Sequence, residues 1–361
     1  MTDNHHQTTP SGRLRARAFG ISFDGTPGPF NAITDVAGVA VGYSVRTGVT
    51  AILPRPRADL ATPVFAGIFS QNGNGELTGS HIIEETGAFN FPITITNTHS
   101  CGVSRDATLR WMQRVLPAAL DSGWGLPVAA ETYDGFLNDI NGHHLRFEHV
   151  AAALDGATSG SIEEGSIGGG TGMIAFGFKA GSGTASRLVE WHGGRYTVGA
   201  LVQANFGKRS NFTIRGLRAG PDLVEPAIRE STPRAEKGSI IGVVATDAPL
   251  LPHQMKRLAR RVPLGVAITG GFGYHSSGDI FLAFSTANRE AALAPSGRIA
   301  SADFIPDTDI DPFFDAVIES VEEAILNALV ANDDMTGRDD NFVPALPKAW
   351  LKGKFGASQG K

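Results

Sequence analysis

The sequence predicts a mixed α/β protein in which β-sheets covered on both faces carry helices on their outer sides. Nearly continuous apolar runs predict the strands, because strands buried on both faces lose the alternation of apolar and polar residues. Stretches with apolar residues at helical spacing lie among these runs and predict the helices. Glycine makes up 45 of the 361 residues without a repeating period, which favours tight turns and close approaches between main chains.

The predicted strands are short and separated by turn residues. Most of them are apolar at nearly every position, which indicates that both faces of the sheet are covered. They are residues 38–43, 49–53, 64–70, 93–97, 173–178, 198–206, 240–246, 266–269 and 280–285. Because strands and helices alternate along the whole chain, one domain with a sandwich core is the simplest architecture.

Three stretches predict helices, and each has a recognisable boundary signal. They are residues 105–120, 249–261 and 310–332. Pro117 is expected to kink the first helix, because proline removes a main-chain donor from the helical ladder. Asp247 is expected to cap the second, whose last turn is basic, as the helix dipole favours. Asp311 is expected to cap the third, which carries one apolar stripe.

The charge balance and the apolar pattern exclude several classes of protein. Lys and Arg total 31 against 36 for Asp and Glu, and the net charge of −5 offers no basic surface for nucleic acid. No apolar stretch reaches about 18 residues, the length of a transmembrane helix, so no membrane partner is expected. Cys101 is the single cysteine, which excludes an intrachain disulfide and favours a reducing, cytoplasmic location.

Two segments look poorly structured. Residues 1–11 are polar and lack the apolar core of a signal peptide, so we expect a disordered tail ahead of a single domain of residues 12–361. Residues 207–237 carry three prolines among charged residues and are expected to form an exposed loop. This loop ends abruptly at Gly238 and Ser239, where a strand of the buried type begins.

The Gly238–Ser239 junction can support a specific reaction. The Ser239 hydroxyl can attack the carbonyl of Gly238 and convert the amide into an ester, whose hydrolysis leaves Ser239 with a free α-amine. Such an amine titrates at about 7.7–8.0 and can act as the base for its own hydroxyl. The alternative is an ordinary turn between a loop and a strand, for which Gly and Ser are common residues.

Long runs of this sequence resemble one family of enzymes, the L-aminopeptidase/D-esterase and β-peptidyl aminopeptidase family. The similarity extends in order over about residues 12–350. It is carried by GTPGPFNAITDVAGVAVGY (25–43), ITNTHSCGVSRDA (95–107), ETYDGFLNDI (131–140), GGGTGMIAFGFKAGSGTASR (168–187), LVQANFG (201–207), GSIIGVVATDAPLLPHQMKRLARR (238–261) and HSSGDIFLAFSTAN (275–288). These motifs are long and specific.

The resemblance implies a self-processing N-terminal-nucleophile hydrolase with a four-layer α-β-β-α sandwich. The chain would be cut into residues 1–238 and 239–361, and Ser239 would carry the acyl group. No metal and no cofactor would be needed. The cleaved heterodimers would associate further into a homo-oligomer, a tetramer by this resemblance.

The resemblance also implies roles for five further residues. Ser277 and Asp279 would hydrogen-bond the nucleophile and hold it in place. Asn205 and Tyr133 would stabilise the oxyanion, and Glu131 would bind the ammonium of the substrate's N-terminal residue. Some family members have Glu at the position of Asp279, and the family often has Asn at the position of Ser276, so the resemblance leaves the substrate preference of the pocket open but not the nucleophile.

The activity implied is that of an aminopeptidase or amidase on small peptides, amides or esters, with β-amino acids or D-Ala as conceivable acyl groups. Two alternatives remain at this stage. An acyltransferase or a linear oligoamide hydrolase would use the same acyl-enzyme, and an uncut, catalytically silent protein would only bind a ligand. Product analysis with an added amine acceptor separates the first pair, and an intact chain on a denaturing gel identifies the last.

Several weaker signals are interpreted as structural. The glycine run 168–172 lacks the GK[ST] ending of a phosphate loop. His143, His144, Glu148 and His149 form a cluster without the HExxH spacing of a zinc site. Cys101 is interpreted as a buried thiol. No GxSxG elbow of an α/β-hydrolase occurs.

Overall fold

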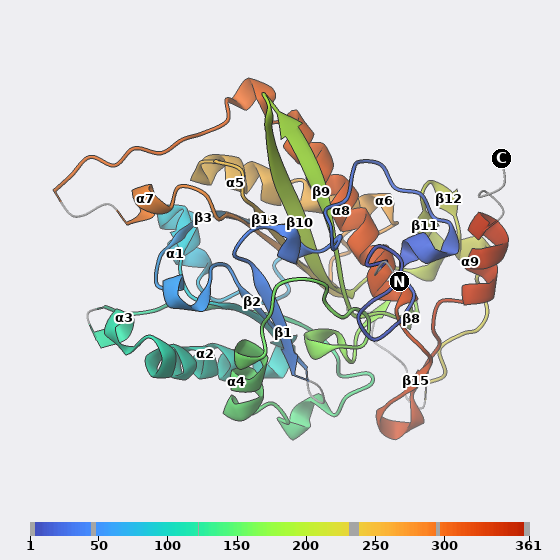
Figure 1. Ribbon diagram of the computed structural model, residues 1–361. Coiled ribbons are helices and arrows are strands. Elements are labelled where there is room, and N and C mark those ends of the chain that lie inside the picture. The colour runs from blue at the N-terminus through green and yellow to red at the C-terminus, as the bar shows by residue number, and fades with distance from the viewer. Residues whose placement is uncertain (1–3, 45–47, 122, 231–237, 294–296, 357–361) are drawn as a thin grey trace.

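The computed structural model describes residues 4–44, 48–121, 123–230, 238–293 and 297–356. Two β-sheets face each other and helices cover their outer faces, which makes four layers (Figure 1). The smaller sheet has four strands in the order β1-β2-β5-β6. Its strands are β1 (Ala40–Ser44), β2 (Val49–Leu53), β5 (Ile93–Asn97) and β6 (Val128–Thr132). β5 and β6 are parallel, and the other neighbours are antiparallel.

The larger sheet has six strands in the order β4-β3-β14-β13-β10-β9. They are β3 (Val64–Ser70), β4 (Ala88–Phe89), β9 (Ser182–Trp191), β10 (Gly194–Asn205), β13 (Ser239–Thr246) and β14 (Gly278–Ser285). β13 and β14 form the one parallel pair among these described strands. All eight residues of β13 are buried, as expected for a central strand covered on both faces.

The outer layers are helical. α2 (Cys101–Val115) and α4 (Phe147–Asp155) cover the smaller sheet, and α5 (Pro252–Ala259), α6 (Val262–Ile268) and α8 (Asp311–Val330) cover the larger one (Figure 1). The shorter helices are α1 (Ser80–Thr86), α3 (Pro117–Asp121), α7 (Arg289–Ala292) and α9 (Lys348–Phe355). Among the described segments, no helix is both long and apolar enough to cross a bilayer.

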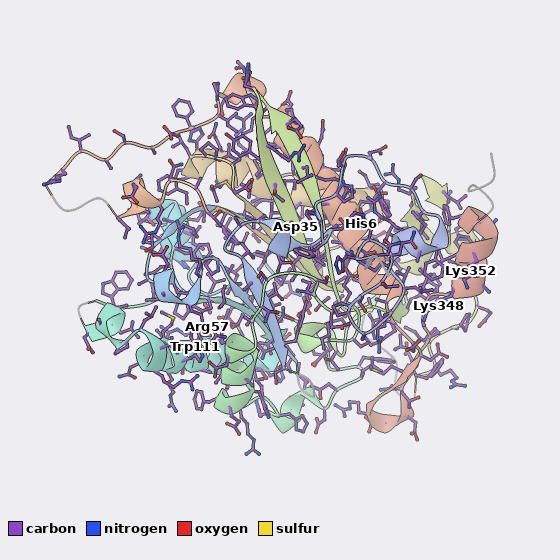
Figure 2. All side chains as sticks on the ribbon, viewed as in Figure 1. His6, Asp35, Arg57, Trp111, Lys348 and Lys352 are labelled. Carbon is purple, nitrogen blue, oxygen red and sulfur yellow. The ribbon has the colours of Figure 1, made fainter. Side chains whose placement is uncertain are left out.

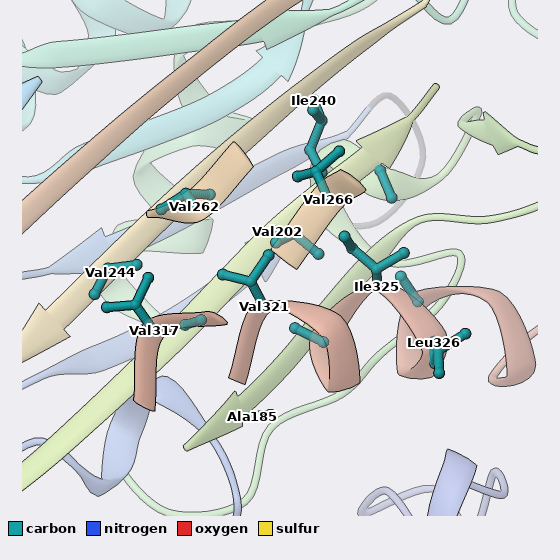
Figure 3. Packing of buried hydrophobic residues seen from close by; sticks show 14 of the residues in the cluster. Ala185, Val202, Ile240, Val244, Val262, Val266, Val317, Val321, Ile325 and Leu326 are labelled. Carbon is teal, nitrogen blue, oxygen red and sulfur yellow. The ribbon is translucent and has the colours of Figure 1, made fainter. Parts of the chain in front are cut away.

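Apolar cores fill the three spaces between the layers. In the outer core of the larger sheet, Val317, Val321 and Ile325 of α8 point toward the strands that carry Val202 and Ile240 (Figure 3). Truncation of Ile325 to Ala would cost roughly 2–5 kcal/mol of stability, because a cavity would replace a fully buried side chain. On the outer face of the smaller sheet, Arg57 and Trp111 lie side by side (Figure 2), with the guanidinium 5.8 Å from the ring centroid.

Two predicted strands are wrong. Residues 266–269 belong to the end of α6 and the turn after it, since a short apolar run does not distinguish a strand from a buried helix. Residues 173–178 form only a small hairpin, β7 (Ile174–Ala175) and β8 (Phe178–Lys179). Its turn places Phe176 and Gly177 at positive φ, which a continuous strand cannot contain.

The strands β6 and β9 were not predicted from the sequence. Both carry small or polar residues at buried positions, such as Thr184 and Ser186 of β9, whose side-chain oxygens bond to groups inside the protein. Two further two-residue pairings complete the described strands. They are β11 (Thr213–Ile214) with β12 (Leu217–Arg218), and β15 (Met335–Thr336) with β16 (Phe342–Val343) besides the hairpin above.

The predicted helix caps are also wrong. α5 begins at Pro252, and Asp247 instead accepts a hydrogen bond from Thr197 N at 2.7 Å. Asp311 is the first residue of α8, and the capping position before it, Ile310, has no side-chain cap. Pro117 acts as expected, because α2 ends at Val115 and α3 begins at the proline.

Two segments expected to lack structure make defined contacts. In residues 4–11, His6 Nε2 lies 2.9 Å from Gly28 O, and Ser11 Oγ donates to Glu163 Oε2 at 2.8 Å. In residues 207–230, Phe212 and Ile214 are fully buried. The expectation of a disordered tail therefore differs from the structure at residues 4–11, and the expectation of an exposed loop fits most of residues 221–230 but not the buried positions of residues 212–220. Residues 1–3 and 231–237 lie outside the described ranges.

Candidate active site

The pairing of three strands places Ser239 in the middle of the larger sheet. Ser239 opens β13, where it lies opposite Asn205 of β10 and beside Gly278 of β14. It is only 4% exposed. The end of β10 and the starts of β13 and β14 thus lie together at one end of these central strands. This brings together predicted site residues from separate parts of the sequence.

Ser277 and Asp279 form a hydrogen-bonded pair at the start of β14, next to Ser239. Ser277 Oγ donates to Asp279 Oδ1 at 2.5 Å, and both residues are buried. Burial raises the pKa of Asp279, while hydrogen bonds from Ser277, the Ile240 main chain and Asn72 oppose this. The aspartate side chain therefore reaches Ser277 despite being one methylene shorter than the glutamate of some family members.

Asn205 is held by hydrogen bonds at both ends of its amide. Its Oδ1 accepts from Ile174 N at 2.9 Å, and its Nδ2 donates to the main-chain oxygen of Tyr133 at 2.9 Å. An amide nitrogen carries two hydrogens, so a second donor is left to point elsewhere. The Tyr133 ring lies against Gly135 and leaves no room for a Cβ there.

Glu131 is a buried carboxylate of the candidate site. It lies on β6, is 3% exposed, and accepts hydrogen bonds from Glu76 N at 3.0 Å and from the Thr98 hydroxyl. Across the described ranges, no Lys or Arg forms an ion pair with it. Burial raises the pKa of its carboxyl group above the ordinary value, although these two hydrogen bonds oppose the shift.

Gly75 connects this carboxylate to the strand beside Ser239. A Cβ placed on Gly75 would lie 3.2 Å from Glu131 Oε1 and 3.3 Å from the Cα of Gly278. Only the main chain of Gly75 therefore separates the carboxylate from the residue that pairs with Ser239.

Asp134 is a buried acid at the site that was not selected from the sequence. Its Oδ2 accepts from Asn138 Nδ2 at 3.0 Å, and burial raises its pKa to about 7. Its Oδ1 and the Oδ1 of Asn97 are both buried without a hydrogen-bond partner in the part of the chain that the structure describes. The sequence signal for Asp134 was its place in the run 131–140, which resembles the family, but a single sequence does not show that its side chain is buried.

The glycine run packs main chains closely beside the site, as interpreted from the sequence. Gly168–Gly170 form a 3-10 turn. A Cβ on Gly169 would collide with Gln203 Oε1 and would lie 2.6 Å from Ile95 O. Gln203 in turn donates to Thr132 Oγ1 at 2.7 Å, so this glycine turn touches a polar link between the two sheets.

The histidines and the cysteine that the sequence indicates as structural do not form a second site among the described residues. His149 Nδ1 lies 3.3 Å from Arg146 N at the start of α4, and His143 stacks on His99 with ring centroids 6.1 Å apart. No group of three potential metal ligands occurs within the described residues. Burial raises the pKa of Cys101 to about 12, so its thiol is a poor nucleophile at neutral pH.

A cavity of about 350 Å³ opens next to the Gly238–Ser239 bond. It has an aromatic wall and a charged wall. Its described lining includes Phe206, Phe272 and Tyr274, the charged residues Lys208, Arg209 and Glu230, and Gly238, Ser277 and Asp279 of the site. Its volume lies at the lower end of the range of small-molecule pockets, roughly 300–1,000 Å³.

A serine that opens a central buried strand of a four-layer sandwich, with a cavity beside it and a buried acid nearby, defines a serine hydrolase of the N-terminal-nucleophile class. Residues 31–343 match Peptidase family S58. The chain belongs to this family.

Named relatives give the same result. The chain is 47% identical to Beta-peptidyl aminopeptidase BapA of Sphingosinicella microcystinivorans, with 94% of this chain and 91% of that protein covered. It is 43% identical to the L-aminopeptidase D-Ala-esterase/amidase of Ochrobactrum anthropi, a structure with a variant of the Ntn hydrolase fold. The TM-score is 0.87 over 95% of this chain and 99% of that one. For a β-aminopeptidase of Burkholderia sp. the identity is 45% and the TM-score 0.85, with 94% and 97% covered.

These findings confirm the resemblance inferred from the sequence and the α-β-β-α fold that it implied. The protein is a serine aminopeptidase of the N-terminal-nucleophile-hydrolase fold.

Proposed function

We propose that the chain cuts its own bond between Gly238 and Ser239, and that the freed Ser239 is both nucleophile and base of the aminopeptidase. One observation carries the proposal. Gly278 N donates a hydrogen bond to the carbonyl oxygen of Gly238 at 3.1 Å, in the ladder that joins β13 to β14. This oxygen gains negative charge when the Ser239 hydroxyl attacks, and the N–H of Gly278 is already placed to donate to it, as a donor of an oxyanion hole does.

Self-cleavage then proceeds in two balanced steps. The Ser239 oxygen bonds to the carbonyl carbon of Gly238, the carbon–nitrogen bond breaks, and the hydroxyl proton ends on the Ser239 nitrogen. Water hydrolyses the resulting ester, which leaves a carboxylate on Gly238 and restores the Ser239 hydroxyl beside a new α-amine. The chain becomes fragments of residues 1–238 and 239–361.

In turnover, the new amine takes the proton of the Ser239 hydroxyl as the oxygen attacks the substrate carbonyl. The amine passes this proton to the leaving nitrogen, and water later releases the acyl group. The pair of Ser277 and Asp279, with its 2.5 Å hydrogen bond, is proposed to hold the hydroxyl and the amine in this arrangement. The buried position of both residues supports the role, because burial restricts their movement.

The oxyanion of turnover is proposed to bind the second hydrogen of Asn205 Nδ2 and the Tyr133 hydroxyl. Asn205 lies directly opposite Ser239, and its amide is fixed at both ends, which supports its part. Removal of one such donor costs about 10²–10³ in rate.

Glu131 is proposed to bind the ammonium of the substrate and so to restrict the enzyme to free N-termini. A buried carboxylate that forms no ion pair with a Lys or Arg of the described residues supports this role, since a substrate cation would supply the missing charge. The names of the relatives support β-aminoacyl and D-Ala esters and amides as substrates.

A tetramer of cleaved heterodimers in the cytoplasm completes the proposal. Leu264, Phe272 and Tyr274 are large apolar residues that are 40–59% exposed near the cavity, and such side chains suit a subunit contact. The buried Cys101 suits a reducing compartment. Gel filtration at the mass of a single folded chain would contradict the assembly.

Protein chemistry tests the central proposal. The purified protein is expected to run as two chains, and the smaller one is expected to begin Ser-Ile-Ile-Gly. A different first residue would assign the nucleophile elsewhere. A panel of α-, β- and D-aminoacyl nitroanilides, assayed with and without an amine acceptor, then identifies the acyl group and separates hydrolysis from transfer.

A further inference from the structure

Lys179 is a fully buried lysine next to the site. Its Nζ donates to three main-chain oxygens, those of Ala180 at 2.5 Å, Met173 at 3.0 Å and Gly170 at 3.4 Å. In the described ranges, no Asp or Glu forms an ion pair with it. Burial lowers its pKa to about 7, and Arg13 adds to the shift. An amine buried without a carboxylate is costly, so its position calls for an explanation.

The contact with Met173 leads directly to Asn205. The carbonyl of Met173 and the N–H of Ile174 belong to one planar peptide unit and point in opposite directions. Lys179 Nζ binds the oxygen at one end of this unit, and Asn205 Oδ1 accepts from the nitrogen at the other end at 2.9 Å. A single rigid peptide therefore joins the lysine to the proposed oxyanion donor.

We propose that Lys179 is a positioning residue of the aminopeptidase, which fixes and polarises the Met173–Ile174 peptide and through it aims the amide of Asn205 at the oxyanion. The inference rests on the proposed role of Asn205. Lys179 itself does not touch the reacting atoms.

The physical basis is a chain of polarised hydrogen bonds. A donor or cation on the Met173 oxygen strengthens the Ile174 N–H as a donor, and this bond in turn draws electrons from the Asn205 amide toward Oδ1. The hydrogens of Asn205 Nδ2 then become better donors, and each such link strengthens the next by about 10–30%. One of these hydrogens is bound by Tyr133 O, and the other is the one assigned to the oxyanion.

The turn itself does not depend on the amine alone. Ala180 N also donates to Met173 O at 3.0 Å, and Lys179 N donates to Pro344 O at 2.7 Å. These main-chain bonds remain when the side chain is changed. Lys179→Met keeps the length of the side chain and removes its donors, so the variant is expected to fold while losing the link to Asn205.

The test is a double-mutant cycle on matured protein with a free-amine nitroanilide. Lys179→Met is expected to lower kcat roughly tenfold, a fraction of the effect of one oxyanion donor. KM is expected to stay unchanged, because no contact of Glu131 involves Lys179. In an Asn205→Ala background the same substitution is expected to lower kcat no further. Lys348→Met is the matched control, since Lys348 lies on α9 (Figure 2) and pairs with Asp333.

The outcomes are distinct. Unchanged kcat in Lys179→Met would overturn the inference, and so would an equal loss of kcat in both backgrounds, because the lysine would then act independently of Asn205. Unchanged kcat in Asn205→Ala alone would refute the proposed function of Asn205. If Lys179→Met does not fold, Lys179→Gln replaces it. It keeps a donor group, so a smaller loss is expected, again absent in the Asn205→Ala background.

Discussion

Two glutamates of this protein are equally buried and have opposite surroundings. Glu131 on β6 is 3% exposed and, among the described residues, accepts hydrogen bonds from an amide and a hydroxyl. Glu323 on α8 is fully buried and binds two guanidinium groups, those of Arg17 at 2.6 Å and Arg187 at 2.9 Å. Burial alone would raise the pKa of both. It does so at Glu131, whereas at Glu323 the two arginines outweigh burial and lower the pKa.

The difference fits a charge that the protein satisfies at Glu323 and, under the proposed function, one that a substrate satisfies at Glu131. The arginines around Glu323 offset the cost of its burial, so this carboxylate contributes to the fold. The site around Glu131 lacks that compensation in the described structure, and a substrate ammonium would provide it. At these two residues the surroundings differ in the guanidinium partners, which Glu323 has and Glu131 does not have within the described residues.

The ion pairs of Glu323 with Arg17 and Arg187 also join the two fragments that the proposed cut would produce. Arg17 and Arg187 precede the Gly238–Ser239 bond, whereas α8 follows it. Arg215 adds another such pair with Glu322 at 2.5 Å. We therefore expect changes near Glu131 and Ser239 to reduce activity, and changes near Glu323 to reduce stability.

The largest effect is expected for Ser239→Ala, which removes the attacking oxygen. The variant should stay a single chain, and its turnover should fall by about 10⁵ or more, as for other nucleophile deletions. The uncut variant should still fold and show a cooperative thermal unfolding transition. A gel and an assay are sufficient to check this. Cleavage at the same bond in Ser239→Ala would show that another group attacks.

Arg187→Met is expected to produce the largest change in stability. It removes one cation from buried Glu323 and should lower the free energy of unfolding by roughly 3 kcal/mol, while turnover per folded molecule stays unchanged. The lowered pKa of Glu323 means that its ion pairs stabilise the fold above the ordinary carboxyl pKa and are lost as pH falls through the lowered one. The difference in the free energy of unfolding between Arg187→Met and the parent protein, measured by urea titration, should therefore become smaller at acid pH. A difference that does not change with pH would contradict the ion-pair explanation.

Glu131→Gln is expected to have a smaller effect that is confined to free amines. Loss of the charge should reduce kcat/KM for free-amine nitroanilides about 10- to 100-fold, because a charge-assisted hydrogen bond becomes a neutral one. Self-cleavage should continue, since that step has no free amine to bind. N-acetylated substrates should be poor for the parent enzyme. Equal turnover of free and acetylated substrates by the parent enzyme would refute the assignment.

The sequence was informative where long apolar runs coincide with buried strands. The bounds of β2, β3 and β5 were predicted to the residue: β2 and β3 are apolar at nearly every position, and β5 alternates Ile and Thr, which are β-branched residues that favour strands. The prediction of a strand at residues 266–269 was wrong because a four-residue apolar run contains too little periodicity. The predicted cap Asp247 was wrong because a tertiary hydrogen bond holds this residue, and the predicted cap Asp311 was wrong because α8 begins at Asp311, one residue earlier than a cap there requires.

The catalytic roles in the sequence analysis came from the resemblance to a family, and the structure adds what no motif contains. It brings Asn205, Ser239 and Gly278 into adjacent register from three separate strands. It also shows that Asp134 and Lys179 are buried next to the site, which depends on long-range packing. A single sequence lists such residues but does not state their solvent exposure, and this is why both were missed.

The smallest effect, and the most direct comparison of the two glutamates, is the pH dependence of substrate binding. The raised pKa of Glu131 means that its carboxyl group takes up a proton at a higher pH than an ordinary glutamate does. Binding of an ammonium needs the ionised form, so KM for free-amine substrates should rise as pH falls through this raised pKa, approaching tenfold per pH unit below it.

Fold stability should respond in the opposite direction, because a raised pKa favours the protonated folded state at low pH and the burial penalty of the charged form appears as pH rises. In Glu131→Gln both dependences should disappear, whereas Arg187→Met should leave the pH profile of KM unchanged. A profile of KM that is identical in the parent protein and in Glu131→Gln would mean that the ammonium is bound by another group, and the contrast between Glu131 and Glu323 would then have no bearing on catalysis.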